Sequence, residues 1–136
     1  KGYRSLGSDI HTNTNPYESG LGFTVKFKKN TDFIGKEALL KIKEQPLQKK
    51  LACMIIDDPE GMALGTEPIY SGGKPVGYVT STNYGYYIDK HIVYGYLPKE
   101  LSDQGTKLEL EYFGKRYPLI VTNEPLLDPE NTRLKS

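Results

Sequence analysis

The stretch KLELEYFGKRYPLIV, residues 107–121, indicates the type of fold that this chain adopts. Its first half alternates leucine with charged residues, so that Leu108 and Leu110 share one face. This period of two is typical of a half-buried β-strand. A Gly114-Lys115 turn follows, and the chain then returns as a second strand. The stretch therefore predicts an antiparallel hairpin with one face in a hydrophobic core.

Upstream of this hairpin, further segments have the composition and spacing of short strands, and the Ser-Gly-Gly-Lys sequence at 71–74 predicts a tight turn between two of them. The predicted strands are 50–56, 67–70, 75–81, 91–97, 107–113 and 116–121. About six strands in roughly eighty residues is the spacing expected of a small barrel or sandwich. Fourteen glycines and nine prolines also favour a turn-rich, mainly β protein over a helix bundle.

The amino-terminal third of the chain has a different pattern. Residues 1–20 predict extended chain and loop, whereas residues 21–28 alternate apolar side chains on one face and predict a half-buried strand. Residues 31–43 predict a helix in their second half, and Pro46 ends it. We therefore expect a boundary within residues 45–49, between a mixed α and β segment and a β domain.

Charge and composition argue against several classes of function. Eighteen basic residues nearly cancel 17 acidic ones, and no dense run of one sign favours nucleic acid as a partner. No apolar stretch approaches the ~20 residues needed to span a membrane, and no secretory signal is visible. Cys53 lies alone in an apolar run, so we expect a buried thiol and a reducing compartment. Because the chain begins at Lys1 in the middle of a pattern, we expect it to belong to a longer parent.

The residues alone predict no catalytic group and no metal site. The sequence has no glycine-rich phosphate loop, no paired-cysteine spacing and no Gly-x-Ser-x-Gly elbow. His11 and His91 are far apart, and each fits a surface or strand-end position. Tyr84 follows a run of hydroxyl residues, and it either stacks a planar ligand or packs in a turn. Arg133, in a polar tail, is either solvated or paired with a carboxylate.

Several motifs along the chain, in order, resemble the glycine-cleavage T-protein family of folate-binding aminomethyltransferases. They are 7–10 (GSDI), 14–21 (TNPYESGL), 32–39 (DFIGKEAL), 65–70 (GTEPIY), 76–81 (VGYVTS), 94–98 (YGYLP) and 105–108 (GTKL). Each motif is weak alone, but the ordered set is specific. The resemblance implies a mainly β (α+β) chain. Residues 1–46 would be the carboxyl-terminal end of the folate-binding domain, and residues 47–136 a small six-stranded antiparallel barrel or jelly-roll-like domain.

Within this family, the chain is most similar to the dimethylglycine and sarcosine dehydrogenase branch, and residues 13–16, 38–43, 114–118 and 124–126 favour the dimethylglycine type. That branch implies oxidative demethylation of an amine, with transfer of the carbon to tetrahydrofolate and with FAD in a domain upstream of this chain. One alternative is a free-standing aminomethyltransferase. Another is a non-catalytic regulatory subunit of the same architecture. The branch places the protein in the mitochondrial matrix of a eukaryote or in the cytoplasm of a bacterium.

The resemblance also assigns candidate ligand-binding residues. Tyr3 matches a tyrosine that lines the folate pocket in some members, and ordinary packing is the alternative. Phe23 stands where many members have a tryptophan, and core packing on its alternating face is the alternative. Arg133 falls near an arginine that reaches folate in some members, and Tyr84 stays a candidate from its local sequence. The aspartate that assists catalysis in the family lies upstream, so we expect an inactive chain that contacts upstream domains and reaches folate and substrate through its parent.

Overall fold

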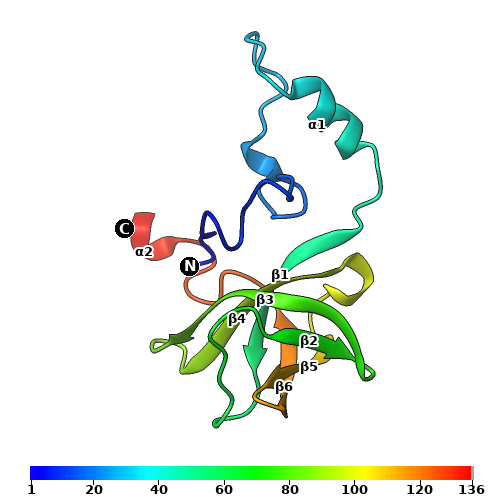
Figure 1. Cartoon of the computed structure of the whole chain (residues 1–136). Coiled ribbons are helices and arrows are strands. Elements are labelled where there is room, and N and C mark those ends of the chain that lie inside the picture. Colours follow the sequence, from blue (N-terminus) through cyan, green and yellow to red (C-terminus); the bar gives the residue numbers. More distant parts are fainter. Residues whose placement is uncertain (136) are drawn as a thin grey trace.

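The computed structural model describes residues 1–135, and its centre is a closed barrel of six antiparallel strands in the order β1-β4-β3-β2-β5-β6 (Figure 1). The strands are β1 (Lys49–Ile56), β2 (Pro68–Ser71), β3 (Lys74–Gly85), β4 (Lys90–Pro98), β5 (Lys107–Tyr112) and β6 (Lys115–Thr122). All six lie where the sequence pattern predicts strands, which confirms the mainly β fold and the antiparallel barrel. The predicted 107–121 hairpin is β5 and β6, with Leu108 paired to Leu119.

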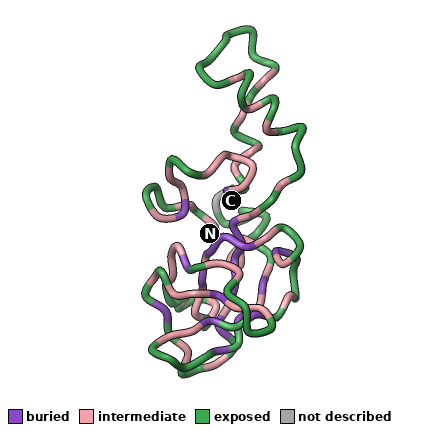
Figure 2. Tube along the Cα trace, turned by 45° about the vertical axis from the view of Figure 1, so that its right-hand side comes forward, coloured by how far each residue is buried: buried purple, intermediate pink, exposed green. Residues whose placement is uncertain are grey.

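The barrel interior holds the hydrophobic core of the chain. The buried core cluster comprises Ala52, Met54, Ile56, Ala63, Ile69, Val79, Val93, Leu97, Leu108, Leu110, Tyr117, Leu119 and Val121. These residues alternate with outward-facing ones on β5, as the period of two requires. Figure 2 shows that the buried residues gather mainly in the barrel, whereas the part of the chain that projects from it is mostly exposed or intermediate. Cys53 is buried as predicted.

Glycines permit the close approach of β3 to β4. A Cβ atom at Gly95 would lie 2.6 Å from the carbonyl oxygen of Tyr78, and one at Gly77 would lie 2.2 Å from that of Tyr96. Because both obstacles are backbone atoms, neither can rotate away. The two glycines therefore allow the tight coiling that closes six short strands into a barrel.

The amino-terminal third forms an arm of loops with the 3₁₀ helix η1 (Gly22–Thr24) and the helix α1 (Lys36–Lys43). Figure 1 shows α1 projecting away from the barrel. The predicted helix in 31–43 is confirmed, and its acidic Glu37 in the first turn and basic residues in the last turn suit the helix dipole. A second 3₁₀ helix, η2 (Lys99–Leu101), follows β4, and a short helix, α2 (Thr132–Lys135), lies in the tail.

The strand predicted at residues 21–28 is wrong. No part of this segment is a strand, and Phe23 is 72% exposed, so the alternative of core packing for Phe23 is wrong as well. The backbone satisfies its N–H groups locally instead. Leu21 N donates to the oxygen of Pro16 at 2.7 Å, and Thr24 N donates to that of Leu21 at 2.9 Å. Alternation gives a strand only where a partner strand lies alongside.

Candidate functional site

Residues 1–10, here called the strap, run across one end of the barrel and are held there by a part-buried ion pair. Arg4 Nη1 donates to Glu124 Oε2 at 2.8 Å, and Arg4 Nη2 also pairs with Glu124. Arg4 Nε donates to the carbonyl oxygen of Ser19 at 3.1 Å, and Nη1 donates to that of Gly2 at 2.6 Å. Burial opposes the charge on Arg4, but the hydrogen bond and the charge of Glu124 outweigh it and raise the pKa of Arg4.

A second attachment joins the strap to β3. The carboxylate of Asp9 is buried, and it accepts hydrogen bonds from Thr80 Oγ1 at 2.5 Å and from Ser81 Oγ at 2.8 Å. The Tyr96 hydroxyl donates to the carbonyl oxygen of Asp9 at 2.7 Å. The strap is thus fixed at Arg4 and at Asp9, with Ser5 to Ser8 between these two points.

The strap borders an open cavity of about 540 Å³, here called the strap cavity. It is lined by Lys1, Gly2, Tyr3, Arg4, Ile10, Gly20, Leu21, Phe23, Glu124, Pro125, Pro129 and Asn131. Tyr3 is 80% exposed and Phe23 is 72% exposed, so each can offer a ring face to this space. The structure therefore brings two of the four predicted ligand-binding residues to one cavity.

The charges around the strap cavity are already paired within the chain. Four hydrogen bonds occupy four of the five N–H donors of the Arg4 guanidinium. Lys1 Nζ donates to Asp128 Oδ2 at 2.9 Å and to Asn131 Oδ1 at 3.2 Å. The cavity therefore offers a planar, uncharged group two aromatic faces, whereas an anionic group would have to compete for occupied cations.

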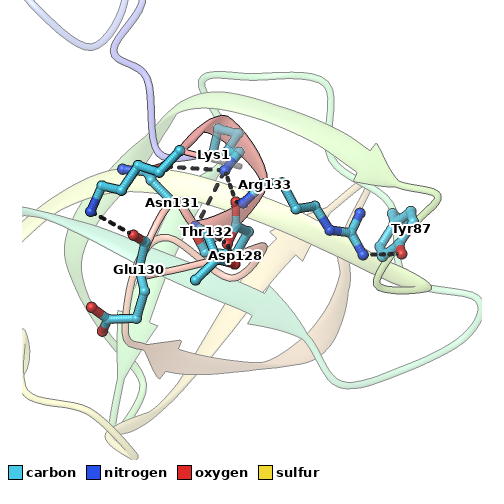
Figure 3. A network of polar contacts seen from close by, with 8 residues as sticks. Lys1, Tyr87, Asp128, Glu130, Asn131, Thr132 and Arg133 are labelled. Carbon is cyan, nitrogen blue, oxygen red and sulfur yellow. Dashed lines mark hydrogen bonds and ion pairs between the residues drawn. The ribbon is translucent and has the colours of Figure 1, made fainter.

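Arg133 lies beside the strap cavity but does not line it. Figure 3 shows its side chain directed away from Lys1, toward Tyr87 on the turn between β3 and β4. Its guanidinium lies 4.7 Å from the centroid of the Tyr87 ring and donates to the Tyr87 hydroxyl, which raises the pKa of Arg133. Arg133 is exposed, and its contact with the Tyr87 ring is one that the sequence did not predict.

The polar network in Figure 3 joins both ends of the chain. Asp128 accepts hydrogen bonds from Lys1 Nζ and from Thr132, whose N and Oγ1 atoms both lie 2.8 Å from Asp128 Oδ1. These bonds from Lys1 and Thr132 hold the pKa of Asp128 far below its usual value. The network thus links the strap to the carboxyl-terminal tail.

Tyr84 lies away from the strap cavity, near the far end of β3. Its hydroxyl donates to Asp89, and its ring meets His91 edge to face with centroids 6.3 Å apart. Tyr84 and His91 line a different open cavity of about 530 Å³ with the loop at residues 57–62. His91 is half-buried, and this burial lowers its pKa, while its Nε2 atom lies 2.9 Å from Thr82 Oγ1. Tyr84 therefore shares no site with Tyr3 and Phe23.

Sequence reasoning missed three residues that build the site, namely Arg4, Asp9 and Glu124. Asp9 stands within the GSDI motif at residues 7–10, which marked a resemblance but gave no role to the carboxylate. Arg4 and Glu124 are 120 positions apart, so their pairing has no local signal. Within residues 1–135, no group of three metal-binding side chains comes together. In the same range, no helix is long and apolar enough to cross a membrane.

The barrel and the comparison with known families define the class of this protein. Residues 49–128 match the family model of the glycine cleavage T-protein C-terminal barrel domain, and the chain belongs to this family. The chain is 41% identical to human mitochondrial dimethylglycine dehydrogenase over 98% of its own length and 15% of that protein. It is 37% identical to an aminomethyltransferase of Prochlorococcus marinus (strain NATL1A), over 88% of this chain and 32% of that protein.

Among solved structures, the crystal structure of glycine cleavage system aminomethyltransferase T from Bartonella henselae has the same fold. It superimposes with a TM-score of 0.85 at 24% sequence identity, over 94% of this chain and 36% of that one. The chain thus spans about a sixth to a third of the length of the curated relatives that it matches. The resemblance that the sequence motifs carried is confirmed.

Proposed function

We propose that this chain is the carboxyl-terminal part of a folate-dependent one-carbon enzyme of the dimethylglycine or sarcosine dehydrogenase type. In such an enzyme, an amine loses a methyl group by oxidation to an iminium, and tetrahydrofolate takes up the carbon. The flavin would lie in a domain outside this chain. The division at residues 46 and 47, and the matrix or cytoplasmic location, stay predictions of the same proposal.

The observation that carries the proposal is the meeting of Tyr3 and Phe23 at the strap cavity. Two exposed ring faces suit a planar heterocycle or an aminobenzoyl ring, because aromatic groups stack in offset or edge-to-face geometry. The charges around them are paired, which favours the uncharged part of folate over its glutamyl carboxylates. In the proposed complex, Tyr3 and Phe23 orient the folate ring and exclude water from it.

This chain provides walls for the folate site and not its acid–base chemistry. The charged side chains that line the strap cavity, those of Lys1, Arg4 and Glu124, are all paired within the chain. Glu124 is bound to Arg4, so it is poorly placed to exchange a proton with a ligand. We therefore infer that the proton transfers use residues outside this chain, and that the isolated chain neither oxidises amines nor transfers carbon.

The first test uses the full-length protein that contains this chain. It should reduce an electron acceptor with dimethylglycine or sarcosine, and with tetrahydrofolate it should form the methylene derivative in place of free formaldehyde. Formaldehyde release that tetrahydrofolate leaves unchanged would refute the folate assignment. Transfer from an aminomethyl carrier protein, with no amine oxidation, would point to the aminomethyltransferase alternative. Absence of both reactions in a correctly folded protein would favour the non-catalytic alternative.

The second test addresses the cavity. In the full-length protein, Tyr3→Ala and Phe23→Ala should each weaken tetrahydrofolate binding by about twofold to tenfold, the range that a lost aromatic contact gives. Phe113→Ala is the matched control, because Phe113 is 90% exposed on the β5–β6 turn and lies outside the strap cavity. Titration calorimetry measures all three. Equal losses in the Phe113 and Phe23 variants would contradict the proposed site.

A further inference from the structure

We propose that Asp9 is a positioning residue, whose buried carboxylate fixes the strap on the barrel and so sets the place of Tyr3 at the strap cavity. The inference rests on the proposed function, which makes tetrahydrofolate the ligand of the strap cavity. The inference adds a role for a residue that touches the barrel and does not line the strap cavity.

The Asp9 carboxylate has a complete set of donors. Asp9 is 1% exposed, and its Oδ1 atom accepts from Thr80 Oγ1 at 2.5 Å and from Ser81 Oγ at 2.8 Å. Its Oδ2 atom accepts from Ser81 Oγ at 3.0 Å and from the Ser5 backbone N–H at 2.9 Å. A buried carboxylate is costly unless donors surround it, and these three groups meet that need.

An irregularity in β3 makes this arrangement possible. Successive side chains of a regular strand point to opposite faces, so Thr80 and Ser81 would not both reach one carboxylate. The pairing of β3 with β4 shifts register between Val79 and Ser81, as a β-bulge does. The bulge redirects the two hydroxyls so that both meet Asp9 Oδ1. Bulges often re-aim a side chain in this way beside functional sites.

Asp9 also closes the part of the strap that follows Tyr3. The backbone N–H groups of Asp9 and Ile10 both donate to the carbonyl oxygen of Ser5, at 2.9 and 3.1 Å. Gly7 N donates back to the oxygen of Ile10 at 2.8 Å. Residues 5–10 thus form one closed turn centred on Asp9, and Ile10 itself lines the strap cavity.

The position of Tyr3 depends on this turn because its ring has little packing of its own. The ring is 80% exposed, so the backbone on either side must hold it. Arg4 fixes the strap to the carboxyl-terminal loop through Glu124, and Asp9 fixes it to the barrel. Apolar contacts alone can stabilise a packed loop at least as well as a buried charge. A buried charge with three directed donors specifies one geometry, which is what a ligand-binding wall needs.

The test compares variants of the full-length protein. Asp9→Asn keeps the size of the side chain but replaces one acceptor oxygen by an NH2 donor. That donor would face the hydroxyl and N–H groups that now donate to Asp9. Asp103→Asn is its matched control, because Asp103 is an exposed residue of the loop between η2 and β5 and is paired with Lys99. Ser81→Ala removes one donor to Asp9, and Ser102→Ala removes a different buried hydroxyl, which donates to the oxygen of Lys99 at 2.7 Å. The readouts are tetrahydrofolate affinity and amide hydrogen exchange in the strap.

Asp9→Asn should weaken tetrahydrofolate binding by about twofold to tenfold and by no more than Tyr3→Ala does, because it acts by misplacing the same ring. Asp9→Asn should also accelerate amide exchange at Gly7, Asp9 and Ile10. The control Ser102→Ala should lower the melting temperature at least as much as Asp9→Asn does, but without loss of tetrahydrofolate affinity. In a Tyr3→Ala background, Asp9→Asn should have little further effect, since the two residues act through the same ring.

Three results would overturn the inference. Unchanged exchange in the strap of Asp9→Asn would show that the carboxylate is not the anchor. Faster exchange in Asp9→Asn with unchanged tetrahydrofolate affinity would show that the anchor does not position the site. Equal losses of affinity in Ser81→Ala and Ser102→Ala would show the same. If the unmodified protein fails to bind tetrahydrofolate, the proposed function falls together with the inference. If it binds and Asp9→Asn binds equally well, only the inference falls.

Discussion

Replacing Arg4 by methionine should release the strap from the carboxyl-terminal loop while the barrel stays folded. The Arg4 side chain is 7% exposed and that of Glu124 is 27% exposed, so the pair is largely shielded from water. At about 4 Å and an effective dielectric constant of about 20, such a pair gains about 4 kcal/mol of Coulomb energy. Removing one partner of a buried pair costs about 3–5 kcal/mol. Because Glu124 is partly exposed, we expect Arg4→Met to destabilise the strap by about 3 kcal/mol.

Amide hydrogen exchange measures this loss at the strap itself. The N–H groups of Asp9 and Ile10 are hydrogen-bonded to the Ser5 oxygen and exchange only when the strap opens. A loss of about 3 kcal/mol predicts exchange that is about 150-fold faster at these positions. Barrel amides of β1 and β4 should be unaffected, because their pairing does not involve Arg4.

Two further variants decide whether the ion pair is the cause. Lys115→Met removes one partner of the exposed Lys115–Glu60 pair, so it should change stability by less than about 1 kcal/mol. The double variant Arg4→Met with Glu124→Leu should recover much of the strap protection, since no buried charge is left unpaired. Less than threefold acceleration in Arg4→Met, or a double variant as exposed as the single one, would refute this reasoning.

Three other predictions concern the barrel. Leu110→Ala should destabilise the chain by about 2–5 kcal/mol in urea unfolding, because Leu110 is fully buried, whereas Glu109→Ala on the outer face should cost less than about 1 kcal/mol. Gly95→Ala should cost at least about 1–3 kcal/mol in the same assay, since its Cβ would meet the Tyr78 backbone oxygen at 2.6 Å, and a stable variant would contradict the close approach. Burial raises the pKa of the Cys53 thiol from 9.0 to about 11, so the native chain should react slowly with a thiol reagent at pH 8 and fast only in denaturant. Because the pKa is raised, the contribution of the Cys53 thiol to stability is complete below pH 9 and is lost as the pH rises toward about 11. Cys53→Ala should abolish this pH dependence of stability.

The strands of the barrel could be predicted because their signals are local. Leu108 and Leu110 alternate with charged residues, and the glycines at 72 and 73 have the positive φ angles that the hairpin turn requires. Each strand also finds a neighbour on both sides in the closed sheet. Local pattern and tertiary pairing agree at these positions, so the pattern alone was sufficient.

The segment at residues 21–28 shows where local pattern fails. Phe23 and Phe27 alternate with polar residues as in a strand, yet no strand lies beside them and η1 forms instead. Phe27 finds a partner in Phe33, with ring centroids 6.3 Å apart, and Lys43 lies over its ring. The sequence could not show this, because strand formation depends on a neighbour that no local window contains.

The candidate site was only half predictable for the same kind of reason. Tyr3 and Phe23 were found through resemblance to a family, and the structure brings both to one cavity. Tyr84 was proposed from its aromatic and hydroxyl neighbours, but the hairpin places it beside His91 and Asp89. Side-chain type predicted the chemistry that each residue can offer, and only the fold decided which of them meet.

The hairpin at residues 107–121 and the four further strands predicted upstream of it were enough to determine a mainly β barrel, because burial of alternate side chains is a local property of sequence. The ordered motifs determined the family. The tertiary structure alone decided the strap and its cavity. Arg4 reaches Glu124 across 120 positions, and Asp9 reaches Ser81 across 72, through a β-bulge that sequence spacing does not reveal. Contacts at such separations depend on how the closed barrel brings distant segments together, and that is a property of the whole fold.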